Sequence, residues 1–189
     1  MAGIAASDAD VVALLMRQHG DIRNLFDEVE RTAGDERRAA FRNLVQLLAV
    51  HETAEEEVIR PFTRSSVPDG AKVADERLAE EREAKELLSR LDGMDTDDPK
   101  FLPELQTLRL DVMKHARAEE RYEFNHIRRH ADKARLASMS TALKAAEAVA
   151  PTHPHPGTES AVKNMALGPV AALVDRTRDA VRKAMGKDG

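Results

Sequence analysis

The chain has 189 residues, 42% hydrophobic and 33% charged, which is typical of a globular protein with a substantial core. Aromatic residues make up only 3%, which favours helices over a β-sandwich, and the absence of cysteine excludes disulfides and thiolate metal sites. The net charge of −5 argues against nucleic acid as a partner, and no run approaches the ~20 apolar residues of a membrane span, so a cytoplasmic protein is expected.

Four amphipathic helices are predicted in the first two thirds of the chain, with apolar residues three and four positions apart. Ser7 or Asp8 is the expected cap of the first helix. The expected ranges are about 8–31, 35–61 or slightly beyond, 71–91, and 100 to beyond His130. Short polar loops between them predict an all-α, up-down-up-down four-helix bundle.

A C-terminal helical extension is predicted to follow this bundle domain, with a division into residues 1–135 and 136–189. The Ala-rich stretch at 138–150 is expected to be weakly helical, and PTHPHPG at 151–157 reads as an extended linker. An amphipathic helix over 169–185 is expected to dock on the bundle or on a partner, which includes a second copy of the chain in a homo-oligomer.

Two segments repeat the pattern His-x-x-x-Glu-Glu: VHETAEEEV at 50–58 and KHARAEERY at 114–122. Residues four apart on an α-helix share a face, so each His/Glu pair can reach one metal centre. Alignment of the first helix with the third places His19 at the position of Glu81. Each of the four helices therefore points a potential ligand inward, and two helices add a second. The six positions are His19, His51, Glu55, Glu81, His115 and Glu119.

A single histidine on an apolar face, such as His19 alone, is more often a hydrogen-bonded core residue than a ligand. The full set is different, because three imidazoles and three carboxylates in a helical core would each cost several kcal/mol without compensation. Two divalent or trivalent cations would remove that cost. The six residues therefore predict a metal centre with histidine and carboxylate ligands.

These motifs, together with RPF after the first block, resemble the hemerythrin-like family, also called the HHE cation-binding domain, over about residues 8–130. The resemblance implies two iron ions in a non-haem centre with an oxo or hydroxo bridge. It also implies that His19, His51 and His115 are terminal ligands and that Glu55 and Glu119 bridge the metals.

The sequence departs from the oxygen-carrying members in its third helix, which has no histidine; Glu81 fills the matching slot, or Glu80 or Glu83 if the register slips. Glu52 is a weaker candidate ligand. Tyr122, seven residues after His115, is expected to share its face as a hydrogen-bond donor to a ligand, a phenolate ligand or a core residue.

A third carboxylate lowers the charge of a diferric, oxo-bridged centre to about +1 and stabilises the oxidised state, since carboxylate is a harder ligand than imidazole. Reaction with O2 or hydrogen peroxide, with possible catalase- or peroxidase-like turnover, is therefore expected over oxygen transport. The alternatives are an oxygen, redox or iron sensor without turnover, and a structural zinc or manganese site.

Two other groups of residues carry weaker signals. His126 and His130 are spaced to bind a divalent ion, but a surface or packing role is expected of them. The basic stretch at 127–135 lacks the aromatic residues and the reading motif of a nucleic-acid interface, so no nucleic acid is expected as a partner.

Overall fold

The structure is a computed structural model, and it describes residues 10–154 and 168–186, with the side chains of 168–171, 173 and 174 left aside. Every regular element within these residues is helical. The elements are α1 (Val11–Arg31), α2 (Gly34–Ser66), α3 (Gly70–Asp92), α4 (Phe101–Ala118), the π-helical turn η1 (Glu119–Glu123), α5 (Phe124–His130), α6 (Lys133–Glu147) and α7 (Gly168–Ala184).

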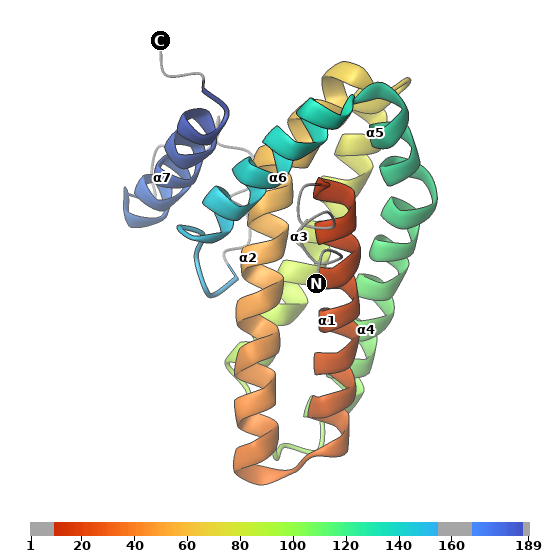
Figure 1. Cartoon of the computed structure of the whole chain (residues 1–189). Coiled ribbons are helices and arrows are strands. Elements are labelled where there is room, and N and C mark those ends of the chain that lie inside the picture. Colours follow the sequence, from red (N-terminus) through yellow and green to blue (C-terminus); the bar gives the residue numbers. More distant parts are fainter. Residues whose placement is uncertain (1–9, 155–167, 187–189) are drawn as a thin grey trace, which may run out of the picture.

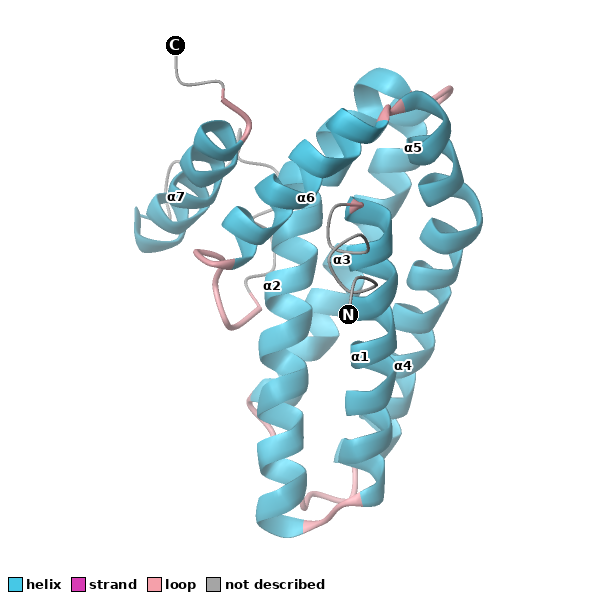
Figure 2. Cartoon of the chain, viewed as in Figure 1, coloured by secondary structure: helices cyan, strands magenta, loops and turns pink. Residues whose placement is uncertain are grey.

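The helices α1 to α4 run up and down beside one another and form the four-helix bundle (Figure 1). The loops between them are short (Figure 2). Helix α4 continues through η1 into α5 without leaving the right-handed helical region of the backbone. The predicted all-α bundle is confirmed. No described helix combines the length and the apolar character needed to cross a membrane.

Two helix boundaries differ from the sequence prediction. The proposed cap of the first helix, Ser7 or Asp8, lies outside the described residues; Asp10 caps α1 by accepting a hydrogen bond from the Val12 N–H at 2.9 Å. The fourth helix was expected to pass His130, but it ends there. The carboxylate of Asp132 then accepts a hydrogen bond from the Arg135 N–H at 2.7 Å and caps the start of α6. This new cap makes α6 a helix separate from α5.

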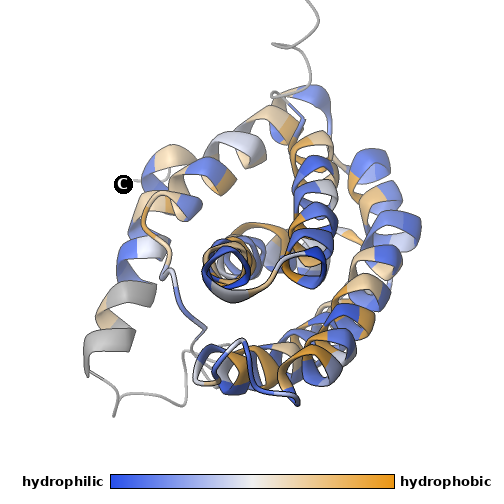
Figure 3. Cartoon of the chain, turned by 90° about the horizontal axis from the view of Figure 1, so that it is seen from below, coloured by the Kyte–Doolittle hydropathy of each residue, from blue (hydrophilic) through white to orange (hydrophobic). Residues whose placement is uncertain are grey.

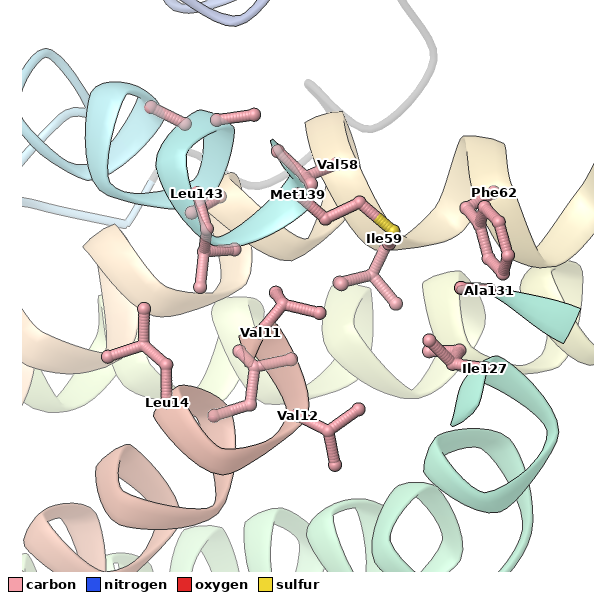
Figure 4. Packing of buried hydrophobic residues seen from close by; sticks show 14 of the residues in the cluster. Val11, Val12, Leu14, Val58, Ile59, Phe62, Ile127, Ala131, Met139 and Leu143 are labelled. Atoms are coloured by element: carbon pink, nitrogen blue, oxygen red, sulfur yellow. The ribbon is translucent and has the colours of Figure 1, made fainter. Parts of the chain in front are cut away.

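Two apolar clusters fill the interior, one at each end of the bundle. Hydrophobic and hydrophilic residues alternate along each bundle helix (Figure 3), and the hydrophobic faces turn inward. The lower cluster contains Phe26, Leu44, Leu88 and Leu105, all fully buried. The upper cluster joins the start of α1 and the end of α2 to residues of α5, α6 and α7 (Figure 4). The predicted metal ligands lie between the two clusters.

Helix α6 crosses α1 and α2 near the upper end of the bundle, and α7 packs on the outside of α6 (Figure 1). The stretch at 138–150 was expected to be only weakly helical, but most of it lies in α6. Burial of Met139, Ala142, Leu143 and Ala146 in the upper cluster stabilises a helix of low amphipathicity. Residues 151–154 of the predicted linker are not helical, and 155–157 lie outside the described residues.

The turn between α2 and α3 brings two backbones unusually close. A Cβ atom at Gly70 would lie 1.9 Å from the carbonyl oxygen of Thr63, so only glycine fits there. This contact sets the position at which α3 starts relative to the end of α2, and the end of α2 carries the residues Arg60 and Thr63 that border the candidate site.

Candidate metal centre

All six predicted ligands converge in the middle of the bundle. Five of them are buried, with between 0 and 4% of the residue exposed, and His115 is half-buried. Their nitrogen and oxygen atoms form two groups, and within each group the atoms lie within 4.8 Å of one another. The first group is His19, His51 and Glu55; the second is Glu55, Glu81, His115 and Glu119. Glu55 belongs to both groups, so the two groups share one carboxylate.

The Nε2 atoms of the three histidines point toward the carboxylates of the cluster. His115 Nε2 lies 3.2 Å from Glu119 and 3.7 Å from Glu81. His19 Nε2 lies 3.3 Å from Glu119, and His51 Nε2 lies 3.5 Å from Glu55.

The opposite ring nitrogen of each histidine donates a hydrogen bond to a residue outside the cluster. His51 Nδ1 donates to Gln18 at 2.8 Å, His19 Nδ1 to Glu120 at 2.9 Å, and His115 Nδ1 to Glu80 at 3.0 Å. In a neutral imidazole, a proton on Nδ1 leaves the lone pair on Nε2 pointing inward, which is the tautomer that a metal-binding histidine needs. The sequence prediction missed these partners, apart from Glu80, which it considered as an alternative ligand.

Several inward-facing atoms are buried without a hydrogen-bond partner among the described residues. They are His19 Nε2, His115 Nε2, Glu55 Oε1, Glu81 Oε2 and Glu119 Oε2. The close approach of His19 to Glu119 lacks hydrogen-bond geometry, so both atoms stay unsatisfied. Each buried unsatisfied group costs about 1–3 kcal/mol, and a core seldom contains several of them together. Imidazole and carboxylate donors arranged in this way fit hard or borderline metal cations.

Arg60 was not predicted as part of the site, yet its guanidinium lies beside the acidic cluster and is only 2% exposed. It donates to Glu81 through Nε at 2.9 Å and Nη2 at 2.6 Å, and to Glu123 through Nη1 at 2.8 Å. Nη2 also donates to Glu119 and lies 3.3 Å from Glu55. Arg60 therefore places a fixed positive charge against four carboxylates.

Helical periodicity alone could not find Arg60. Nine residues separate it from His51, which corresponds to about 180° around the helix. Its side chain reaches the cluster because helical side chains tilt toward the N-terminus and because arginine is long. The RPF motif, part of the family resemblance, contains the only sequence signal for Arg60.

Tyr122 is not in the site, which corrects the prediction. It is 66% exposed, whereas the next residue, Glu123, is buried and hydrogen-bonded to Arg60 and Thr63. The cause is η1, whose π-helical turn accommodates one residue more than an α-helical turn. The register after Glu119 shifts by one position, so the inward face falls on Glu123.

Glu52, the weaker candidate, is buried beside the cluster but belongs to neither group of potential ligands. Burial raises its pKa to about 7, against the opposing effect of Lys85. Its Oε2 atom has no hydrogen-bond partner among the described residues. Lys85, also buried, forms an ion pair with Glu56.

Burial and neighbouring charges shift the pKa values of the cluster residues in different directions. Burial lowers the pKa of His51 to about 3, and His19 acts in the same direction. Burial raises the pKa of Glu55 well above its usual value, and Glu119 adds to this effect. Burial opposes the charge on both His115 and Glu119, but their mutual attraction prevails: the pKa of His115 lies well above its usual range and that of Glu119 well below.

A cavity of about 20 Å³ borders the histidines, enough for roughly one water-sized molecule. Its walls include His19, His51, His115, Glu52 and Glu81, and its apolar side is formed by Ile22, Leu48, Ala84 and Val112. Any molecule that reaches the cluster through this space must be very small.

His126 and His130, the other spaced pair, lie away from the cluster. Their rings stack with centroids 6.1 Å apart, and His130 Nδ1 donates to the backbone oxygen of His126 at 2.8 Å. Neither belongs to a group of described residues that could hold a metal ion.

Comparison with known proteins gives a consistent result. Residues 10–127 match the protein-family model described as hemerythrin HHE cation binding domain. An uncharacterized hemerythrin-like protein of Schizosaccharomyces pombe is 23% identical over 172 residues, which cover 89% of this chain and 85% of that protein. A DNA nickase of Nostoc is 27% identical over 146 residues, which cover 77% of this chain but 41% of the nickase.

A solved structure has the same fold. The crystal structure of a hemerythrin HHE cation-binding domain-containing protein from Mycobacterium kansasii superimposes with a TM-score of 0.65 and 21% sequence identity. The superposition covers 88% of this chain and 98% of the mycobacterial chain.

Proposed function

Because this chain belongs to the hemerythrin HHE cation-binding domain family, we propose that it binds two iron ions in the bundle core and acts in oxygen or peroxide chemistry, as part of a redox or oxidative-stress response. The observation that carries the proposal is the set of buried donor atoms that have no hydrogen-bond partner within the described part of the chain, together with the two groups of potential ligands that share Glu55. His19 and His51 would hold one ion with Glu55. Glu81, His115 and Glu119 would hold the other, with Glu55 between them.

The enclosed geometry favours a very small ligand, such as O2 or hydrogen peroxide. The cavity beside the histidines has a volume of about 20 Å³, and five of the six proposed ligands are buried. The match to the Nostoc relative covers only 41% of that protein, so its nickase activity is not assigned to this chain. A cytoplasmic location is part of the proposal, and cell fractionation tests it.

The three proposed carboxylate ligands support a reaction with O2 or peroxide over the reversible transport of O2. Three proposed carboxylate ligands favour ions of higher charge, and bound iron would supply redox and Lewis-acid chemistry. Arg60 donates to Oε1 of Glu81, while Oε2 of the same side chain has no hydrogen-bond partner in the portion of the chain that the structure describes. Glu81 Oε2 is therefore an atom that can bind a cation or accept a proton from a small molecule in the cavity.

The test uses the full-length chain loaded with Fe(II) without oxygen. Metal analysis is expected to find about two iron ions per chain. Exposure to peroxide is expected to produce O2, and the oxidised iron protein is expected to absorb in the near ultraviolet. Replacement of Glu81 by alanine is expected to lower O2 production about 10- to 100-fold. Glu83→Ala, an exposed position on the same helix, is the control. An iron-loaded protein that leaves peroxide unchanged would rule out the enzymatic form of the proposal.

A sensor without turnover is the second candidate, and the packing of α6 and α7 on the bundle favours it. Arg178 of α7 lies 3.2 Å from Glu57 of α2, two residues from Glu55. A stoichiometric colour change accompanied by altered oligomeric state would identify a sensor, whereas repeated turnover would identify an enzyme. Zinc or manganese in the purified protein, with no iron bound on reloading, would instead indicate a structural centre.

A further inference from the structure

A chain of hydrogen bonds connects α6 with the metal centre. Glu147, the last residue of α6, accepts a hydrogen bond from the side-chain amide of Gln18 on α1 at 2.5 Å. The oxygen of the same amide accepts from His51 Nδ1 on α2 at 2.8 Å. Residue 147 lies beyond the 10–127 segment that matches the family model, so the connection starts outside that domain.

His51 differs from the other two histidines in the kind of side chain that accepts the hydrogen bond from its Nδ1. His19 and His115 donate to carboxylates, Glu120 and Glu80, and a carboxylate can only accept. His51 donates to an amide, which can turn over and present its NH2 group instead. An NH2 group in that place would favour the tautomer with the proton on Nε2, and that tautomer cannot bind a metal through Nε2.

Glu147 removes this ambiguity. Its carboxylate needs a donor, so it selects the NH2 side of Gln18 and turns the amide oxygen toward His51. We propose that Glu147 is a positioning residue: through Gln18 it keeps the Nε2 lone pair of His51 directed into the proposed metal centre. The bundle and its C-terminal extension are then connected by these hydrogen bonds as well as by apolar packing. The effect on metal binding rests on the proposed function, but the effect on the tautomer does not.

The packing of α6 holds Glu147 in place for this role. Ala146 and Leu143 are fully buried in the upper apolar cluster together with Leu14 and Leu15 of α1. Helix α6 therefore cannot turn about its axis without exposing these side chains. Any partner that displaced α6 would withdraw Glu147 from Gln18.

The first test is the tautomer of His51 in the full-length, metal-free protein labelled with 15N-histidine. Two-bond 1H–15N correlations distinguish a proton on Nδ1 from one on Nε2. The unmodified chain is expected to carry the proton on Nδ1. Glu147→Lys places a donor opposite Gln18, which should turn the amide and move the His51 proton to Nε2. Asp179→Lys makes the same charge change at an exposed position of α7 and should leave the tautomer unchanged.

A double variant separates this role from simple structural damage. In Gln18→Glu, Glu147→Lys, the introduced carboxylate can accept from His51 Nδ1 and from the introduced ammonium at once. It is expected to restore the Nδ1 tautomer. The proposal is overturned if Glu147→Lys leaves the tautomer as it was, or if the double variant fails to restore it while the circular dichroism spectrum remains helical.

Iron binding supplies the second readout. Loss of the partner of a metal-bound histidine typically weakens binding about 10- to 100-fold. Glu147→Lys is expected to raise the Kd for one of two Fe(II) ions at least about 10-fold, and the double variant to recover most of it. If the unmodified chain binds no iron, the proposed function fails and the tautomer result still decides the role of Glu147. If it binds iron and Glu147→Lys binds equally tightly, the proposal on Glu147 fails alone.

Discussion

Arg60 is the residue through which the protein itself compensates part of the negative charge of the cluster. Its guanidinium reaches four carboxylates, of which Glu55, Glu81 and Glu119 are proposed ligands. Such a buried cation partly offsets the repulsion between the acids, but it cannot satisfy every oxygen atom. Metal ions would complete that compensation, so Arg60 and the cations act on the same carboxylates.

Replacement of Arg60 by methionine is expected to destabilise the metal-free protein by about 3–5 kcal/mol, because the carboxylates lose their buried partner. The loss should be smaller in the iron-loaded protein, where cations take over part of that role. Thermal unfolding with and without iron measures both values. Arg64→Met, which removes a more exposed ion pair with Asp75, is the control and should change stability by less than about 1 kcal/mol. Equal losses in both forms of Arg60→Met would contradict this account.

The π-helical turn η1 is the element that decides which side chains of the last bundle helix face inward. It places Glu123 next to Arg60 and turns Tyr122 to solvent. It also carries Glu119, so the irregular turn and the candidate centre coincide. Single π-helical turns inside α-helices frequently occur at functional sites, and here the turn adds one carboxylate to the interior.

Deletion of Tyr122 is expected to be tolerated. It would convert the π-helical turn to a regular one and leave Glu123, Phe124 and Ile127 facing the core. Deletion of Asp111, an exposed residue in the regular part of α4, removes a residue that the helical register needs. It would rotate the residues on one side of the gap by about 100° relative to the other. Circular dichroism melts should retain a cooperative transition only for the Tyr122 deletion. Equal damage from the two deletions would show that η1 does not absorb a residue.

At the scale of the whole molecule, the C-terminal extension shares a core with the bundle. Leu143 of α6 points toward Leu14 of α1, and Met139 lies against Ile59 of α2 (Figure 4). The candidate centre lies between this upper cluster and the lower one, so it is held from both ends. The boundary at residue 135 stays a prediction, and unfolding experiments can test it.

Leu143→Ala is expected to lower the free energy of unfolding by about 2–5 kcal/mol, because it leaves a cavity between α6 and the bundle. If α6 and the bundle unfold as one unit, a single transition shifts as a whole, whether it is followed by circular dichroism or by calorimetry. Leu110→Ala, at a side chain that is 69% exposed, is the control and should have little effect. A separate early transition, with the main transition unmoved, would place α6 outside the cooperative unit.

Helical periodicity was sufficient to predict the four bundle helices and the inward direction of the six potential ligands, which are His19, His51, Glu55, Glu81, His115 and Glu119. These features depend on the spacing of residues within one helix, which the local backbone geometry repeats every 3.6 residues or so. The pattern of polar groups on apolar faces then pointed to cations, since few other arrangements compensate such a core.

Only the tertiary structure decided the position of Arg60, the register of Glu123, and the connection from Glu147 through Gln18 to His51. Each depends on contacts between separate helices or on a backbone irregularity that no periodic pattern contains. The length of the arginine side chain, the extra residue of η1 and the packing of α6 act through distances across the bundle. Those distances exist only once the helices have assembled.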